Sequence, residues 1–231
     1  MIIFLIKLIA APLLLALATL AARRWGTVLG GILIGLPLIS GPISVFLAIE
    51  NGAGFAVETA RGALAGTVAL AVFTCVYAAV CPKGWLKASF LSVALYVLAS
   101  WIAAELPISA VTLAVSAAAA IVLSLWIMPV PHSAAVKRRP PKHDLLMRMG
   151  MMMVLMIAIT MAVFSQIQGG PDNARRAMHG LMLGMYSGLV FNLVVWALAA
   201  EDRLLIAYAA AIAAALAAQG VVLALTLKKT A

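Results

Sequence analysis

Long apolar segments constrain the fold of this chain more than any other feature. Eight of them cover most of the 231 residues, at positions 2–22, 27–49, 56–80, 86–104, 107–128, 145–167, 174–199 and 203–227. A backbone amide finds no hydrogen-bonding partner in hydrocarbon, so a segment that crosses a bilayer is a helix or a strand of a closed barrel. These segments approach the ~20 residues that span a bilayer as a helix, and they lack the alternation of barrel strands. The sequence therefore predicts an all-α, polytopic integral membrane protein with about eight transmembrane helices.

The composition excludes a sizeable soluble domain and several classes of function. Hydrophobic residues make up 66% of the chain and charged residues only 10%, far from the balance of globular domains. The net charge of +9 lies in short loops between apolar segments, where bases set membrane orientation and attract anionic lipid headgroups. No basic stretch is interleaved with aromatic residues as in a nucleic-acid-binding surface. Catalytic, cofactor-binding and metal-binding motifs are missing, so we expect no enzyme, no cofactor and two free thiols, Cys75 and Cys81.

The middle of the chain is repeated at an offset of 118 residues. Residues 45–73 align without a gap with residues 163–191. The identical pairs are Val45/Val163, Phe46/Phe164, Ile49/Ile167, Gly52/Gly170, Ala56/Ala174, Gly62/Gly180, Gly66/Gly184, Val72/Val190 and Phe73/Phe191. Glycines four residues apart let helix backbones approach closely in a bilayer. We therefore expect the two Gly-x-x-x-Gly pairs to form equivalent close helix crossings, which a bulky residue at Gly66 would wedge apart.

The repeat predicts two tandem four-helix units. Residues 1–129 form the N-terminal unit, residues 130–144 form a polar basic linker, and residues 145–231 contribute three clear spans that pair with the segment 107–128. An even number of spans in each unit predicts that both units face the same way. The positive-inside bias then places the linker in the cytoplasm and both termini outside. If residues 86–128 were a single broken helix, the chain would have seven spans and its second half would be turned over.

The second apolar segment contains GLPLISGPIS at residues 35–44. Proline removes a helical hydrogen bond and clashes with the preceding turn, so Pro37 and Pro42 predict a broken span. Broken spans often mark a binding site near the midplane, because their freed backbone groups can bind a substrate. The candidate substrate-binding residues in this segment are Pro37, Ser40, Gly41, Pro42 and Ser44. The alternative is a kinked helix whose small residues allow tight packing.

Ionisable residues near the predicted helix ends form a second group of candidates. Glu58 and Arg61 lie three residues apart on one helical face, and their equivalents in the second copy are Arg176 and His179. Charge within or beside a membrane often marks a pathway, although a structural pair at the interface is the alternative. The candidate substrate-binding residues of this group are Glu50, Glu58, Arg61, Arg175 and His179, at an expected outer mouth, and Asn192, which lies deeper. An interhelical hydrogen bond is the alternative role for Asn192.

Methionines cluster at residues 147–161, and Met178 and Met182 flank His179. Thioethers bind Cu(I) well, which makes copper transport an alternative. Consecutive methionines point in several directions around a helix, however, and this suits gap filling in a core better than a row of ligands. We therefore predict no metal site.

Two stretches resemble the small bacterial GlpM-type membrane proteins. They are GLPLISGPISVFLAIENG (35–52) and the tail GMYSGLVFNLVVWALAAEDRLLIAYAAAIAAALAAQG (184–220). That family has a Gly-Leu-x-Pro-type broken helix, a glycine loop and a Gly-hydrophobic-Ser helix, in a single four-span unit. The resemblance implies that this chain is a fusion of two such units. It implies no biochemical activity, because the family has none that is securely known.

The duplication, the broken helix and the lack of catalytic motifs are typical of a transporter or exporter of a small solute in the bacterial inner (cytoplasmic) membrane. Its expected partners are the bilayer, including anionic lipids, the solute, and a second copy or a membrane complex. The alternative is a non-transporting scaffold or assembly subunit of a larger complex. A continuous polar cavity at the level of Pro37–Pro42 would favour the transporter, whereas dry packing there would favour the scaffold.

Overall fold

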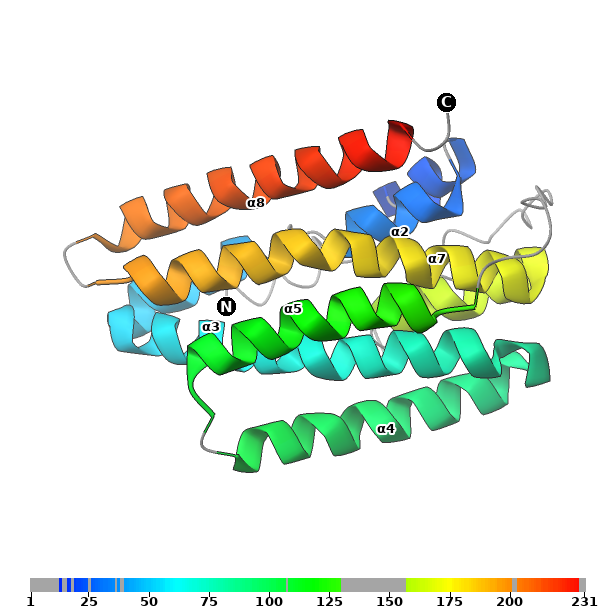
Figure 1. Cartoon of the computed structure of the whole chain (residues 1–231). Coiled ribbons are helices and arrows are strands. Elements are labelled where there is room, and N and C mark those ends of the chain that lie inside the picture. The colour runs from blue at the N-terminus through cyan, green and yellow to red at the C-terminus, as the bar shows by residue number, and fades with distance from the viewer. Residues whose placement is uncertain are drawn as a thin grey trace.

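The computed structural model describes residues 13, 16–17, 19–24, 26–35, 37, 40–106, 108–129, 157–200 and 203–228. The elements are α2 (Thr27–Gly35), α3 (Ser40–Val80), a short 3₁₀ helix η1 (Cys81–Lys83), α4 (Trp85–Glu105), α5 (Ala110–Ile127), α7 (Ile157–Leu198) and α8 (Leu204–Lys228). They form an elongated bundle (Figure 1). Five helices in the described ranges are long and apolar enough to cross a membrane, and no strand occurs there. The predicted all-α class is therefore confirmed for this part of the chain. Most of the expected first span, the linker 130–144 and the start of the sixth span lie outside the described residues.

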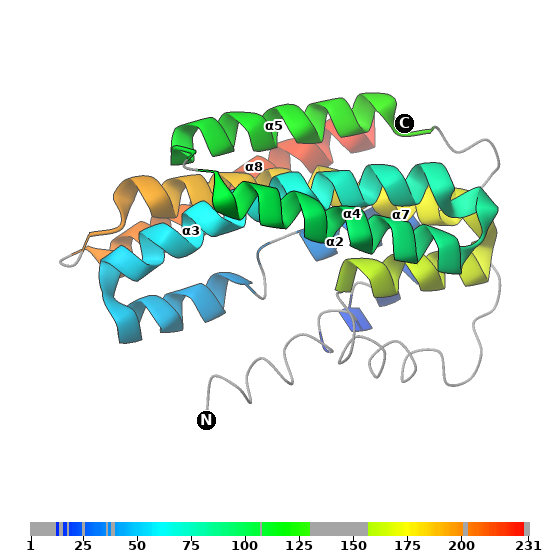
Figure 2. The same ribbon diagram turned by 90° about the horizontal axis from the view of Figure 1, so that it is seen from below.

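Two glycines reverse the direction of the chain. Gly52 has φ 85° and ψ 176°, and Gly170 has φ 76° and ψ −175°. Both values lie in a region of backbone space that is essentially restricted to glycine. Each glycine divides its helix into two arms, so that α3 consists of residues 40–51 and 53–80, and α7 of residues 157–169 and 171–198. Figure 2 shows both helices folding back on themselves as helical hairpins.

The two hairpins point in opposite directions along the bundle. The Gly170 end of α7 meets the C-terminal end of α3, because Arg175 Nε donates to the carbonyl of Ala78 at 3.1 Å. At the other end, Ala56 and Ala60 at the start of the second arm of α3 pack with Phe191 near the end of α7. The second arms of α3 and α7 are therefore antiparallel. The expectation that the repeated segments face the same way is wrong, because an apolar pattern specifies spans but not which helix ends meet.

The stretch from residue 86 to residue 128 forms two helices and not one broken helix. The chain leaves α4 at Leu106, in an extended conformation, and α5 begins after its N-cap residue Ser109. The Ser109 hydroxyl accepts a hydrogen bond from the amide of Thr112 at 3.2 Å, which satisfies one of the free amides at the start of α5.

Large apolar side chains on the outer faces of α4, α5 and α8 are exposed, as expected for helices that face lipid. The most exposed are Leu86, Phe90, Trp101, Val115, Trp126, Leu205, Ile206, Val221 and Leu225. Trp85 and Trp126 lie at the same end of the bundle, where α4 begins and α5 ends. Tryptophan is enriched at membrane interfaces, so this end is expected at the level of the lipid headgroups.

Basic residues gather at the end of the bundle that carries Gly170. Charged side chains described there include Lys83, Lys87, Arg175 and Arg176, together with the acid Asp172. Those described at the opposite end, near Gly52, are Arg61 and Arg203 together with Glu50, Glu58 and Glu105. Helices α5 and α8 both end on the basic side (Figure 1). The end of α8 and the start of the linker therefore share one side, which corrects the expectation that they lie on opposite sides.

The positive-inside rule predicts that the basic end is cytoplasmic. We expect a reporter fused after Lys228 to be active if it functions in the cytoplasm and inactive if it needs export. An insertion of the same reporters in the loop between Glu105 and Ser109 should show the reverse pattern. Exported-reporter activity at the C-terminal end of α8 would contradict this orientation.

The positive φ of Gly52 predicts that alanine destabilises the protein much more at Gly52 than at Gly54. Gly52→Ala should lower the free energy of unfolding by on the order of 1–3 kcal/mol, because a Cβ strains this backbone conformation. Gly54→Ala is the matched control, since Gly54 is helical and a Cβ there would meet no described atom within 4 Å. Thermal unfolding in detergent, followed by circular dichroism, measures both. Equal effects of the two substitutions would contradict the assignment of the reversal to Gly52.

Candidate functional site

A cavity of about 410 Å³ lies between α3, α4 and α5. Both α4 and α5 pack on α3, but in the described ranges they do not contact each other. The side chains and backbone that line the cavity come from Glu58, Arg61, Gly62, Ala65, Gly66, Tyr96, Ser100, Ala103, Ala104 and Leu113. Gly66 lies halfway along the second arm of α3. The cavity therefore reaches from the Gly52 end of the bundle to about the middle of this arm.

An ion pair and a hydrogen bond to the backbone define the outer end of this cavity. Arg61 Nη1 lies 3.6 Å from Glu58 Oε2, and both side chains are partly exposed. The Arg61 guanidinium also donates to the carbonyl of Ile108, at 2.9 Å from Nη2 and 3.2 Å from Nε. Because Ile108 belongs to the loop between α4 and α5, Arg61 links this loop to α3. Loose, exposed ion pairs contribute little to stability, so Glu58 can be exchanged for another anion at low cost.

The inner part of the cavity offers hydrogen-bonding groups that the sequence did not single out. The hydroxyl of Ser100 is buried and has no hydrogen-bond partner among the described residues. Tyr96 lies one turn earlier on α4 and also lines the cavity. A buried hydroxyl without a partner costs free energy. The only signal in the sequence was a polar residue within an apolar helix.

The repeated glycines occupy different surroundings in the two copies. A Cβ on Gly62 or Gly66 would meet no described atom within 4 Å, so these glycines leave the cavity open. A Cβ on Gly180 would collide with the backbone of Val28, whose carbonyl carbon lies 2.8 Å from that position. The expected equivalent crossings are therefore wrong. A close crossing exists where α2 covers α7, and at Gly66 a leucine would fill space rather than separate two helices.

The predicted break in the second span is present, but it does not line this cavity. The chain leaves α2 at Gly35, turns at Pro37 and enters α3 at Ser40. Gly41 and Pro42 therefore lie in the first turn of α3, where proline is tolerated. The side chains of Ser40 and Pro42 lie outside the described part of the structure.

The start of α3 packs against the other hairpin. A Cβ on Gly41 would lie 3.6 Å from the ring of Phe191, and the Ser44 hydroxyl lies 2.6 Å from the hydroxyl of Tyr208. Tyr208 also donates to the Ser44 carbonyl at 3.1 Å. The described side chains of this segment are therefore in direct contact with α7 and α8.

The residues expected at one outer mouth lie at two opposite ends. Glu58 and Arg61 lie at the Gly52 end, where Glu50 is exposed. Arg175 lies at the other end, where it donates a hydrogen bond to the carbonyl of Ala78. Ala78 follows Arg61 by 17 residues on the second arm of α3. At 1.5 Å per residue this separation is about 25 Å. His179 lies one turn after Arg175 on α7, so it shares that end.

The deeper candidate, Asn192, makes a local contact. Its side-chain amide donates to the carbonyl of Gly188 at 2.8 Å, within its own helix. It lies on the second arm of α7, one residue beyond the buried ring of Phe191. The structure therefore places it apart from the cavity between α3, α4 and α5.

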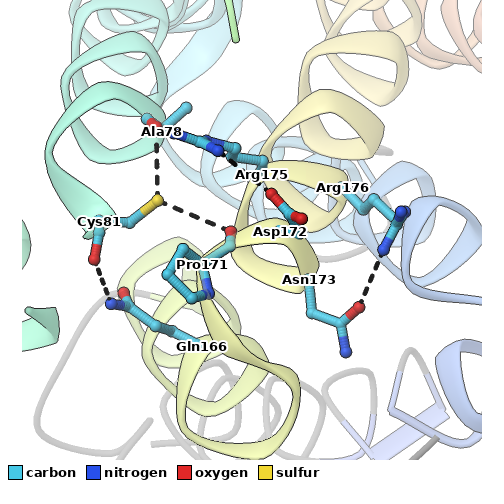
Figure 3. Close-up of polar contacts among 8 residues, drawn as sticks. All are labelled: Ala78, Cys81, Gln166, Pro171, Asp172, Asn173, Arg175 and Arg176. Atoms are coloured by element: carbon cyan, nitrogen blue, oxygen red, sulfur yellow. Dashed lines mark hydrogen bonds and ion pairs between the residues drawn. The ribbon is translucent and has the colours of Figure 1, made fainter. Parts of the chain in front are cut away.

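A buried polar network joins the turn of the α7 hairpin to the end of α3 (Figure 3). The Gln166 amide donates to the carbonyl of Cys81 at 2.6 Å and accepts from the Tyr77 hydroxyl at 2.8 Å. Arg175 donates to Asp172 and to Ala78, both at 3.1 Å. These contacts give Arg175 a structural role, because they join the α7 turn to the end of α3. Gln166 belongs to the short polar stretch before the Gly170 turn, and its buried role was not evident from the sequence.

Among the described residues, no three His, Cys, Asp or Glu side chains come close enough to hold a metal ion. Met178 and Met182 are fully buried in the hydrophobic core, which fits their expected role as core packing. Comparison with protein-family models, curated proteins and solved structures finds no match to this chain. The resemblance to GlpM-type proteins therefore remains a hypothesis.

Removing the Gln166 amide should destabilise the protein without a direct effect on the cavity. In Gln166→Leu, the Cys81 carbonyl and the Tyr77 hydroxyl lose a buried partner, at a cost of about 1–3 kcal/mol. Asn192→Leu is the control, because its amide bonds only within its own helix. Thermal unfolding should show the larger loss for Gln166→Leu. A Gln166→Leu protein as stable as the wild type would contradict the structural role of the network.

Proposed function

We propose that this protein is a transporter or exporter of a small solute in the bacterial cytoplasmic membrane, and that the solute binds in the cavity between α3, α4 and α5. The observation that carries the proposal is this cavity itself, because it places hydrogen-bonding groups inside an otherwise apolar bundle. Its volume of about 410 Å³ lies within the range of small-molecule sites.

The arrangement of the two hairpins supports transport. Gly52 and Gly170 are aligned in the sequence and share the same unusual backbone conformation. Aligned residues of the two second arms are also buried in both copies, as for Phe73 and Phe191. We infer that the hairpins are a pair of inverted repeats, which is a common construction of secondary transporters. On this inference, the predicted duplication would consist of inverted rather than parallel units.

The chemistry of the cavity favours a solute with a carboxylate or another anionic group and with hydroxyl or amide groups. Such an anion would replace Glu58 beside Arg61, since their ion pair is exposed and loose. The polar part of the solute would reach Ser100, and its apolar part would contact the alanine-lined wall formed by Ala65, Ala103 and Ala104. Glu50 lies outside the residues that line the cavity.

A non-transporting scaffold or assembly subunit is the second candidate. It is favoured by the direct packing of Gly41 on Phe191 and of Ser44 on Tyr208, since dry packing at the broken segment is what a scaffold requires. A transporter is compatible with the same packing only if its site lies elsewhere, as in the cavity between α3, α4 and α5.

A binding screen with three variants separates these possibilities. Purified protein is screened by thermal shift against metabolites, lipids and metal ions. A compound at 100 times its Kd stabilises the folded state by about 2.7 kcal/mol. We expect such a compound to be an organic anion, and its stabilising effect to be lost in Gly66→Leu, which fills the cavity, and reduced in Ser100→Ala. Ser44→Ala, which lies outside the cavity, should retain it.

Uptake of the identified compound into proteoliposomes then distinguishes transport from binding. Transport by the wild type and its loss in Gly66→Leu, with an unchanged amount of folded protein, is the expected result. Binding without uptake would support the scaffold. Loss of binding in Ser44→Ala, with binding retained in Gly66→Leu, would contradict the cavity site and place solute binding at residues 37–44 instead.

A further inference from the structure

Gln219 on α8 is a buried amide that the fold leaves unsatisfied. Its side chain is only 3% exposed, and neither Oε1 nor Nε2 has a hydrogen-bond partner among the described residues. An unpaired amide in an apolar environment costs free energy that a leucine of similar size would avoid. A residue that costs stability in the observed conformation is a candidate for a role in another conformation.

The position of Gln219 follows from the packing of α8 on α7. Tyr208, Ala211, Ala215 and Gln219 are spaced by three, four and four residues, so they share one helical face. The first three pack with α7, where the rings of Tyr208 and Phe191 lie 6.1 Å apart. The helices are antiparallel, and Gln219 is 11 residues beyond Tyr208. It therefore lies against α7 at about the level of Gly180, which is 11 residues before Phe191.

In the repeat alignment, the region around Gly180 and Gln219 corresponds to the cavity between α3, α4 and α5. The offset of 118 relates Gly62 and Gly66 to Gly180 and Gly184, and it relates Ser100 to Ala218, the neighbour of Gln219. At Gly62 the space is open. At Gly180 it is closed, because α2 crosses α7 there in direct backbone contact.

Among the described helices, only α2 covers α7 at Gly180, and the two backbones are in close contact there. In the described ranges α2 contacts no helix except α7. A Cβ on Gly31 would lie 2.7 Å from the amide nitrogen of Leu181, as close as the Cβ of Gly180 would lie to Val28. Helix α2 has nine residues, and all its described helix–helix contacts are with α7, so its departure from α7 would break a single described helix–helix interface.

We propose that α7 and α8 form a second, closed solute site around Gly180, Gly184 and Gln219, which opens toward the basic end of the bundle when α2 leaves Gly180. The inference rests on the proposed transport function and on the inverted relation of the hairpins. The site takes the same class of solute, a small organic anion with hydrogen-bonding groups, and the Gln219 amide supplies one donor and one acceptor for it. The open cavity and the closed site then face opposite sides of the membrane.

Accessibility to a membrane-impermeant maleimide tests the proposal in the full-length chain. Single cysteines are placed at Gly66 and Ala218 in a Cys75→Ala, Cys81→Ser background. Gly66→Cys should react only from the side of the Gly52 turn. Ala218→Cys should react slowly and only from the opposite side, in right-side-out and inverted membrane vesicles compared in parallel.

A matched pair of substitutions tests the role of α2. Gly180→Ala should accelerate labelling of Ala218→Cys at least about tenfold, because its Cβ forces α2 away. Gly62→Ala, the repeat-related control, should change nothing, since a Cβ there meets open space. If Gly180→Ala reduces folded protein, Ile32→Ala replaces it, because Ile32 is a buried residue of α2 and is 1% exposed.

The role of Gln219 is tested by a leucine at the same position. Gln219→Leu should raise the thermal midpoint while lowering uptake of the compound identified by the binding screen. A lower midpoint would show that Gln219 has a structural partner and would overturn the proposal. Labelling of Ala218→Cys from the same side as Gly66→Cys would also overturn it, as would no labelling in any background. Opposite-sided labelling of a protein that moves no compound would instead refute transport and leave the second site in place.

Discussion

The path of this chain depends on an unusual backbone conformation at two positions, which only glycine adopts readily. At Gly52 and Gly170 a positive φ is combined with an extended ψ, and this ends one helical arm and starts the next in the reverse direction. Without these reversals, each apolar stretch of about 40 residues would continue as a helix far longer than a bilayer is thick. The reversals also bring Ala48 of the first arm of α3 into contact with Ala56 and Ala60 of the second arm. The core at that end of the bundle therefore follows from a single backbone conformation.

The antiparallel hairpins explain how one sequence pattern produces two different surroundings. Both second arms carry glycines four residues apart, but α2 contacts only α7, at Gly180. Close backbone approach is the main attraction available between helices in lipid, where the hydrophobic effect between them is absent. At Gly180 this attraction is used for packing, whereas at Gly62 and Gly66 the same small surface borders the cavity between α3, α4 and α5.

Polar groups hold the ends of the bundle, and their distribution differs between the ends. The Gly170 turn is joined to α3 by hydrogen bonds of Gln166 and Arg175 that are satisfied within the protein. The other end has an exposed ion pair between Glu58 and Arg61 and a buried hydroxyl, Ser100, without a partner in the described structure. Satisfied polar networks rigidify the elements that they join.

The sequence by itself determined the helical class, the position of the proline break and the gaps between apolar spans in which the two glycine turns lie. These are local properties, because apolar length, proline chemistry and the permitted φ of glycine act within a few residues. It also identified Glu58 and Arg61 as a pair, since a spacing of three residues on a helix is a local relation.

It did not reveal that the hairpins are antiparallel, that Arg61 and Arg175 lie at opposite ends, or that Ser100 and Gln219 lack partners among the described residues. Those features depend on which helix faces which, and an apolar pattern that is hydrophobic on all sides carries almost no information about facing partners. Only the tertiary structure decided them, through the backbone contact of α2 with α7 and the separation of α4 from α5.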